Sequence, residues 1–408
     1  MIDEIWSCEN KKTAKRFLML SFAVFFSKGA SLLVNVIAAN NLGVELYGVF
    51  KYYNTIVCYF LLALNLGFDV YFLRKCINSE LPISKALGIQ LCSRGWLSVI
   101  FFLILIPFGI YKLGYPGNLI LILLSFKLII FVFNIEWLIR LYENFKLLSV
   151  LTIVSSVFLL LFVWFFVCGN MGVAVLCIAF LVSDMAMVVG QWIFAGRHIA
   201  RPSLLEVWSN IKESVVISLS CFMVSIYYNI DTLMLGIFRS NYEVGLYSAA
   251  YTILLAFIFP AAVLYQVYAP RLSANIMSKQ ILKDYVFHAL IIGGALFAIL
   301  FSFHRFLILK VYGQTYAGSV NALLWLSIDI IPCYLAGAFS IPINLWGFHR
   351  EYLYIVTFGA IANIIGNYFF IPEYGINAAI ATTILSEVLV FVLGAGCIYL
   401  KFKTKESS

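Results

Sequence analysis

Charged residues are scarce in this sequence: only 11% of its 408 residues are Asp, Glu, Lys or Arg, whereas 63% are hydrophobic. A soluble domain carries about 25% charged residues, so this composition excludes a chain whose surface faces water throughout. Lipid must therefore solvate most of the chain, which indicates an integral membrane protein.

Sequence signatures of catalysis, metal binding and disulfide bonding are also missing. The four histidines are isolated, with no HExxH motif, and the chain has neither a nucleophile elbow nor a Walker motif. The nine cysteines are placed singly, mostly within apolar runs, so they support neither a disulfide framework nor a metal site. We therefore expect no cofactor and no enzymatic activity.

Long apolar runs, in contrast, recur along the whole chain. A bilayer-spanning helix needs roughly 20 mostly apolar residues. Twelve such runs lie near 17–39, 48–73, 86–111, 118–138, 147–168, 171–195, 214–238, 246–270, 286–309, 321–347, 352–371 and 376–400. The first is too long for the core of a cleavable signal peptide, so we interpret it as a retained helix. The sequence predicts an all-α polytopic membrane protein with about twelve transmembrane helices.

The longest polar interruption divides these runs into two sets of six. It predicts an N-terminal lobe at 1–195, a cytoplasmic linker at 196–213 and a C-terminal lobe at 214–408. A short motif also repeats at an offset of 200 residues, as ELYG at 45–48 and GLYS at 245–248. Six helices per copy would give both copies the same orientation, which predicts a parallel repeat with the substrate path between the copies.

Positive residues concentrate on one side of this topology. Of the 27 Lys and Arg residues, 19 fall in the terminal segments and the loops on their side, three fall in the opposite loops, and five lie within apolar runs. Because Lys and Arg are enriched in cytoplasmic loops, both termini are predicted to be cytoplasmic. The net charge of +8 is then a topology signal and does not indicate nucleic-acid binding.

Three cations lie deep within apolar runs: Lys28, Arg94 and Lys127. Ser31 and Asn35 follow Lys28 at i+3 and i+7, which extends a polar stripe along one helix face. An ionisable residue at mid-membrane costs at least ~2.5 kcal/mol and usually faces the bundle interior or a wet cavity. These cations therefore line a hydrophilic cavity or, alternatively, form structural pairs with buried carboxylates.

Four acids occupy similar positions: Asp184, Asp231, Asp329 and Glu387. Tyr228 precedes Asp231 by three residues, so the two share a helix face. The acids either carry coupling protons or form ion pairs that fix helix packing, and the residue pattern leaves both interpretations open.

Several short motifs, in order along the whole chain, resemble those of the Wzx-type O-antigen flippases. These flippases form part of the polysaccharide transporters within the multidrug/oligosaccharidyl-lipid/polysaccharide (MOP) exporter superfamily. The motifs are SKGA at 27–30, NNLG at 40–43, LYG at 46–48, YNID at 228–231, EVGLY at 243–247, APRLS at 269–273, IPEYGINAA at 371–379 and SE at 386–387. One departure is Ala378, where the resemblance leads us to expect glycine.

The resemblance implies a two-lobed flippase in the bacterial inner membrane. Its substrate would be an undecaprenyl-diphosphate-linked O-antigen repeat unit, moved from the cytoplasmic to the periplasmic leaflet by alternating access during lipopolysaccharide biosynthesis. Lys28, Arg94 and Lys127 would bind the diphosphate, because charge-assisted hydrogen bonds to phosphate oxygens are strong. Coupling to H+ or Na+ and contacts with other O-antigen assembly proteins are further implications of the resemblance.

Three other functions fit parts of the pattern. A drug/cation antiporter of the same superfamily would share the architecture, but acidic cavity charges are expected there, whereas the first half of this chain supplies cations. An O-antigen polymerase or ligase would need a large periplasmic loop, and the non-cytoplasmic loops here are around ten residues or fewer. A structural membrane scaffold would need no buried charges.

Overall fold

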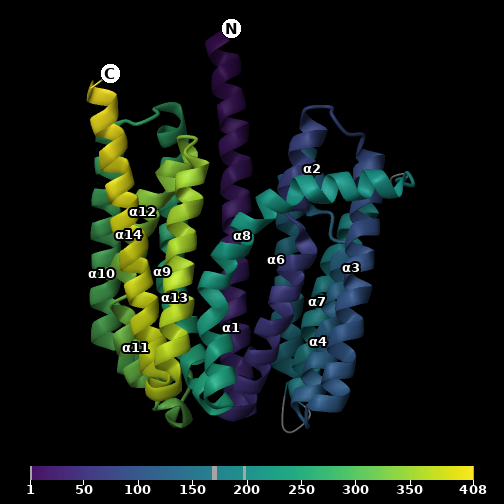
Figure 1. Ribbon diagram of the computed structural model, residues 1–408, viewed down its shortest axis with the longest axis vertical. Helices are drawn as coiled ribbons and strands as arrows, with labels where there is room; N and C mark the ends of the chain where they lie inside the picture. Colours follow the sequence, from purple (N-terminus) through teal and green to yellow (C-terminus); the bar gives the residue numbers. More distant parts are fainter. Residues whose placement is uncertain (1, 168–171, 196–198, 408) are drawn as a thin grey trace. The chain divides into compact units, whose positions relative to one another are not determined.

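The computed structural model describes residues 2–167, 172–195 and 199–407, and this part of the chain contains helices but no β-strand. Figure 1 shows that most of these helices are long. The helices are α1 (Ile2–Asn65), α2 (Phe68–Ile77), α3 (Ile83–Lys112), α4 (Gly117–Val132), α5 (Glu136–Leu141), α6 (Phe145–Phe166), α7 (Gly172–Ala195), α8 (Leu204–Phe238), α9 (Asn241–Ala274), α10 (Lys279–Val311), α11 (Ser319–Ser327), α12 (Ile330–Leu345), α13 (His349–Tyr374) and α14 (Ile376–Ser407).

The membrane-spanning segments follow the predicted runs. Within the described residues, nine helices are long and apolar enough to cross a bilayer, and α11 with α12 makes a further span that is bent by 41°. Gly43, at φ 75° and ψ 171°, divides α1 into two legs. The first leg contains the run near 17–39, and the second, together with α2, covers the run near 48–73. Because α8 contains the run near 214–238, each of the twelve runs overlaps a helix. The prediction of an all-α, multi-pass membrane protein is confirmed.

The chain packs as two compact units. Unit 1 comprises residues 1–42 and 53–222, and unit 2 comprises residues 43–52 and 223–408. The boundary between 222 and 223 lies inside α8, whereas the sequence places a linker at 196–213. From Leu204 onward that segment is already helical.

Two glycines explain why residues 43–52 pack with unit 2. A Cβ atom added at Gly48 would lie 1.7 Å from the carbonyl oxygen of Asn241, and one added at Gly245 would lie 2.1 Å from the carbonyl oxygen of Val44. Only glycine permits such close approach of the α1 and α9 backbones, as at other small-residue helix crossings in membranes. Both glycines belong to the LYG and EVGLY motifs of the sequence, so part of that pattern has a packing role.

Three spans contain breaks, and each break leaves backbone groups that lipid cannot satisfy. Leu66 and Gly67 adopt positive φ angles of 52° and 66° between α1 and α2. Residues 133–135 separate α4 from α5, and residues 328–329 separate α11 from α12. In unit 1 the short helices after the first two breaks pack together, with the rings of Phe72 and Trp137 5.6 Å apart. Asn65, Asn134 and Asp329 lie at these breaks.

Candidate functional site

A buried hydrogen-bond network in unit 2 centres on Asp231 of α8, which is only 3% exposed. Its Oδ2 accepts hydrogen bonds from the hydroxyls of Tyr247 (2.7 Å) and Thr383 (2.6 Å), and its Oδ1 accepts one from Nδ2 of Asn367 (2.6 Å). The donors belong to α9, α14 and α13. Burying a carboxylate is costly unless hydrogen bonds compensate for lost water, and here four helices converge to supply them.

The network continues through amide and hydroxyl groups. Nδ2 of Asn367 also donates to Oδ1 of Asn363 (3.0 Å), and the Thr382 hydroxyl donates to Oδ1 of Asn367. Asn363 and Asn367 are four residues apart and so lie on one face of α13. Neither residue was among the predicted site residues. Their i, i+4 spacing inside the apolar run near 352–371 was the signal that could have predicted a polar helix face.

Two further carboxylates lie close to this network. Asp329 is 2% exposed and stands at the break between α11 and α12, while Glu387 on α14 is 4% exposed. Asp329 is within electrostatic reach of both Glu387 and Asp231, and its Oδ1 has no hydrogen-bond partner within the described residues. Unit 2 therefore brings together three of the four predicted intramembrane acids.

Tyr228 has a different environment from its helical neighbour Asp231. Its side chain is 42% exposed, and its backbone carbonyl accepts a hydrogen bond from the hydroxyl of Tyr251 (3.4 Å). The Tyr251 ring stacks on that of Tyr247 at 5.5 Å, with 14° between the planes. Tyr251 thus links the backbone of α8 at Tyr228 with Tyr247, which donates to Asp231.

Arg94 on α3 is completely buried and joins two of the helix breaks in unit 1. Its Nη1 donates to the carbonyl of Asn134 (2.9 Å) in the α4–α5 break, and its Nη2 donates to Oδ1 of Asn65 (2.5 Å) at the end of α1. Nη2 is also 3.2 Å from a carboxylate oxygen of Asp69 on α2. The guanidinium lies over the Phe131 ring, 4.8 Å from its centroid. Arg94 thus supplies donors where two broken helices lack them.

Neighbouring amides support the same α4–α5 break. Nε2 of Gln90, one turn before Arg94, donates to the Asn134 carbonyl (2.7 Å), and Oε1 of Gln90 accepts from the indole of Trp137 (2.5 Å). Oε1 of Gln191 accepts from the backbone N–H of Ile135 (2.9 Å). The break is therefore satisfied by side chains of α3 and α7, as a non-helical backbone at membrane depth requires.

Lys127 and Asp184 form an ion pair between α4 and α7 in unit 1. Their charged atoms are 3.3 Å apart, with side-chain exposures of 13% for Lys127 and 42% for Asp184. The ammonium also lies 5.1 Å from the Phe180 ring centroid. The sequence left two interpretations open for Lys127, a cation that lines a cavity and a cation paired with a carboxylate. The structure shows the pair with Asp184.

Lys28 is the exposed member of the three predicted cations. It makes no hydrogen bond or ion pair within the described part of the chain. Ser31, one turn further along α1, is also exposed, and its carbonyl accepts from Nδ2 of Asn35 (2.8 Å). The predicted polar stripe on α1 therefore presents a cation and a serine at the surface of unit 1.

Comparison with known proteins identifies relatives in sequence and in fold. The profile of the polysaccharide biosynthesis protein family matches residues 13–276, more than half of the chain. No curated protein matches this chain in sequence. A solved structure of the lipid II flippase MurJ in an inward closed conformation is similar in fold, with a TM-score of 0.78, 13% identity, and coverage of 94% of this chain and 87% of that chain.

Two transporters of the MOP superfamily are also similar in fold. An inward-facing multidrug resistance MATE family transporter has a TM-score of 0.73 and 16% identity, over 92% of this chain and 96% of that chain. A transporter from Pyrococcus furiosus, described as having a binding pocket of reverse polarity, has a TM-score of 0.64 and 15% identity, over 94% and 96%. At these identities the structural matches establish the fold alone.

Proposed function

This chain belongs to the polysaccharide biosynthesis protein family, and we propose that it is a flippase for undecaprenyl-diphosphate-linked O-antigen repeat units. It moves them from the cytoplasmic to the periplasmic leaflet of the bacterial inner membrane by alternating access. The observation that carries this proposal is the coincidence of a polysaccharide family with a fold shared with a lipid II flippase. A transporter, and not an enzyme, is what this combination supports.

The cations of unit 1 suit a diphosphate ligand. A sugar diphosphate cannot enter hydrocarbon unaided, because unsolvated charge in lipid is strongly unfavourable. Lys28 is exposed within a membrane-spanning leg of α1 and has no partner in the described chain, so we assign it the first contact with the diphosphate. Lys127 can follow by exchanging Asp184 for a phosphate oxygen. Arg94 acts as a positioning residue that holds the two broken helices together.

The acids of unit 2 suit a coupling role. Asp231 is held by neutral donors and Asp329 retains an unpartnered oxygen, and neither forms an ion pair within the described residues. Such carboxylates gain or lose a proton, or exchange it for Na+, according to how much water reaches them. We therefore assign the H+ or Na+ coupling to Asp231, with Asp329 and Glu387 as its electrostatic neighbours.

A drug/cation antiporter is the second candidate, because the same buried acids and the MATE fold favour it. The two functions differ in the charge of the transported molecule. A flippase needs the unit 1 cations, whereas an antiporter for cationic drugs needs only the unit 2 acids.

Reconstituted vesicles distinguish these candidates. A fluorescent undecaprenyl-diphosphate oligosaccharide is placed in the vesicle membrane, and the fraction that a membrane-impermeant quencher reaches is followed over time. The proposal expects rapid exchange with the wild-type chain and a loss of at least tenfold in rate for Lys28→Ala, at equal protein in the membrane. Transport of a cationic dye without any movement of the lipid would instead support the antiporter.

The predicted topology is a separate part of the proposal. Reporter fusions after Ser408 and in the α8–α9 connection near Asn241 are expected on opposite sides of the membrane, with the C-terminus in the cytoplasm. A C-terminal reporter in the periplasm would reverse the direction of the proposed transport.

A further inference from the structure

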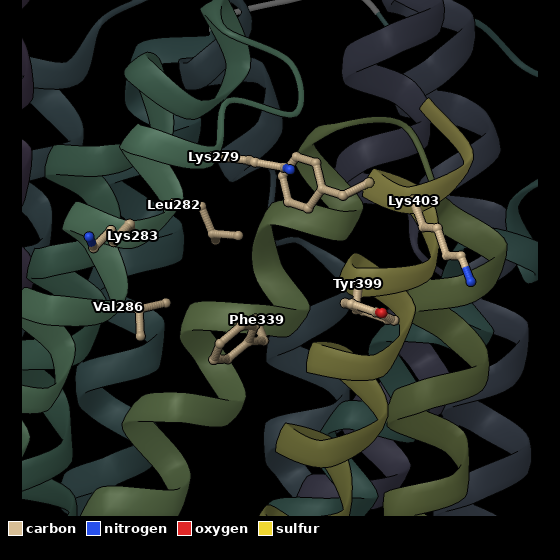
Figure 2. Close-up of a pocket in the computed structure, with 8 residues that line it drawn as sticks. Lys279, Leu282, Lys283, Val286, Phe339, Tyr399 and Lys403 are labelled. Atoms are coloured by element: carbon tan, nitrogen blue, oxygen red, sulfur yellow. The ribbon is translucent and has the colours of Figure 1, made fainter. Parts of the chain in front are cut away.

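A basic hollow of about 480 Å³ lies in unit 2, at the end where α10 begins and α14 finishes. Its walls come from α10, α12 and α14, and Figure 2 shows the side chains of α10 and α14 on opposite sides of the opening. The polar network around Asp231 contributes none of its lining. The hollow is therefore a separate feature from the proposed transport site.

Three lysines and no carboxylate line this hollow: Lys279 and Lys283 from α10, and Lys403 from α14. All three are exposed. Lys283 forms no ion pair within the described chain, and the Lys279 ammonium lies 5.4 Å from the centroid of the Phe402 ring. Because α10 begins at Lys279, the partial positive charge of its N-terminus adds to that of the lysines. The opening of the hollow therefore attracts an anion.

The rest of the lining is apolar. On α10 and α12 it comprises Leu282, Val286 and Phe339, with Leu282 only 7% exposed. On α14, Phe402 and Tyr399 lie beside Lys403, and Tyr399 is 67% exposed. Tyrosine rings of this kind are enriched at the level of lipid headgroups.

Charged lining residues lie towards the ends of both helices. On α10 the lining covers about 10 Å at 1.5 Å per residue, from Lys279 through Leu282 and Lys283 to Val286, so both lysines precede the last apolar residue. On α14 the lining runs inward from Lys403 to Tyr399. A free phosphate would need only the charged opening. A molecule with a phosphate group joined to hydrocarbon chains matches the whole hollow.

We propose that this hollow binds an anionic phospholipid, with its phosphate between Lys279, Lys283 and Lys403 and its acyl chains along Leu282 and Phe339. Basic pockets between membrane helices are known to take such headgroups. The lysines of α10 and α14 face each other across the hollow, and a shared anion removes their mutual repulsion. The bound lipid therefore also stabilises the packing of these two helix ends.

Native mass spectrometry of the full-length purified chain in detergent tests this proposal without measuring transport. Phosphatidylglycerol and phosphatidylcholine are titrated separately, and the bound fraction is compared. The wild-type chain is expected to bind phosphatidylglycerol at least tenfold more tightly than phosphatidylcholine. Replacing all three lysines of the hollow by Gln is expected to abolish this preference.

The matched control removes the same charge elsewhere. Lys112, Lys146 and Lys310 are exposed residues outside the hollow, and their triple Gln variant is expected to keep the preference. Lys283→Arg, which keeps the charge, is expected to bind like the wild type and guards against a folding defect in the triple variant. Equal binding of both lipids to the wild type would overturn the proposal.

Two further outcomes would overturn the assignment of the occupant. Competition by millimolar inorganic phosphate would indicate a site for the free anion. Displacement of phosphatidylglycerol by an equimolar amount of undecaprenyl diphosphate would indicate the carrier lipid as the true occupant. A preference that survives in the lysine triple variant would place lipid binding elsewhere on the chain.

Discussion

Replacing Arg94 by Leu is expected to destabilise the protein and not only to slow transport. The substitution removes the donors to the Asn65 amide oxygen and the Asn134 carbonyl, both partly buried beside helix breaks. An acceptor left unsatisfied in a buried place costs about 1–3 kcal/mol. The Asn134 carbonyl keeps its hydrogen bond from Gln90, so its cost lies at the low end of this range. The Asp69 side chain is 38% exposed, so water can replace its contact with Arg94.

These contributions sum to about 2–4 kcal/mol of lost stability. A loss of that size lowers the midpoint of thermal unfolding by roughly 2–5 °C in a chain of 408 residues, because the entropy of unfolding is about 2.1 cal/mol/K per residue. Arg94→Lys is expected to fall between the wild type and Arg94→Leu. A single ammonium carries the charge but lacks the planar fork that reaches two breaks at once.

The assay is the unfolding midpoint of the purified variants in one detergent, measured together with lipid flipping in vesicles. Lys28→Leu is the matched control, because it removes a positive charge from the same unit at an exposed residue without partners. Its midpoint is expected to equal that of the wild type while its transport is lost. An unchanged midpoint in Arg94→Leu together with lost transport would refute the positioning role and support direct binding of the diphosphate.

Three further predictions concern packing, coupling and pH. Gly48→Ala is expected to lower the unfolding midpoint, because the new Cβ would collide with the α9 backbone. Gly294→Ala, with nothing within 4 Å of its Cβ, is expected to leave the midpoint unchanged. Equal effects of the two substitutions would argue against the close crossing of α1 and α9. Asp231→Asn keeps the size of the side chain but cannot take up a proton, so in vesicles with an imposed pH gradient it is expected to bind the lipid-linked substrate yet flip it slowly and without dependence on the gradient. Unchanged gradient-driven flipping would leave Asp231 a structural role. The hydrogen bond from Lys85 lowers the pKa of Glu206 from 4.5 to about 2, so the contribution of this pair to stability is complete above pH 4.5 and is lost as the pH falls towards 2. Hydrogen exchange of the first turns of α8 is expected to accelerate over that interval in the wild type, and acceleration to the same extent in Glu206→Gln would exclude the pair as its cause.

The helical architecture could be predicted from sequence because lipid allows few alternatives. Each backbone group in hydrocarbon must be satisfied within the chain, so a run of about 20 apolar residues becomes a helix almost regardless of its neighbours. The break near 133–135 could not be found in this way, because Phe133, Asn134 and Ile135 look like any apolar run with one amide. What stabilises this break comes from Gln90 and Arg94 on another helix, and such pairing depends on tertiary packing.

The polar segment before the seventh predicted span shows a second limit, which concerns its secondary structure. The linker at 196–213 stays a prediction, and from Leu204 onward this segment is helical, with the side chains of Leu204 and Leu205 more than 80% exposed. Leu204, Val207, Trp208 and Ile211 follow the spacing of one helix face, and this pattern was visible in the sequence. Composition averaged over the whole segment concealed it.

The intramembrane charges illustrate why position alone could not define the site. Arg94 and Lys28 looked equivalent in the sequence, since each is a single cation in an apolar run. Their environments differ because Asn65 and Asn134, remote in sequence, meet at Arg94, while Lys28 makes no hydrogen bond or ion pair within the described residues. The same holds for Asp231, whose donors lie 16 to 152 residues away. Hydropathy places a charge within a membrane-spanning run, but neither its burial nor its partners can be predicted from it.

The helix α8 connects the two kinds of site, because its ends are held in different units. Near its start, Glu206 accepts a hydrogen bond from Lys85 (2.6 Å), and Glu213 forms an ion pair with Lys75 (2.7 Å), all within unit 1. Towards its other end, Asp231 is held by the network of unit 2. A proton that reaches Asp231 removes the charge that attracts three donors, which weakens the hold on that end while the start remains fixed. On the coupling role proposed for Asp231, the two contacts at the start of α8 hold the helix that carries the coupling acid, without touching either the ion or the substrate.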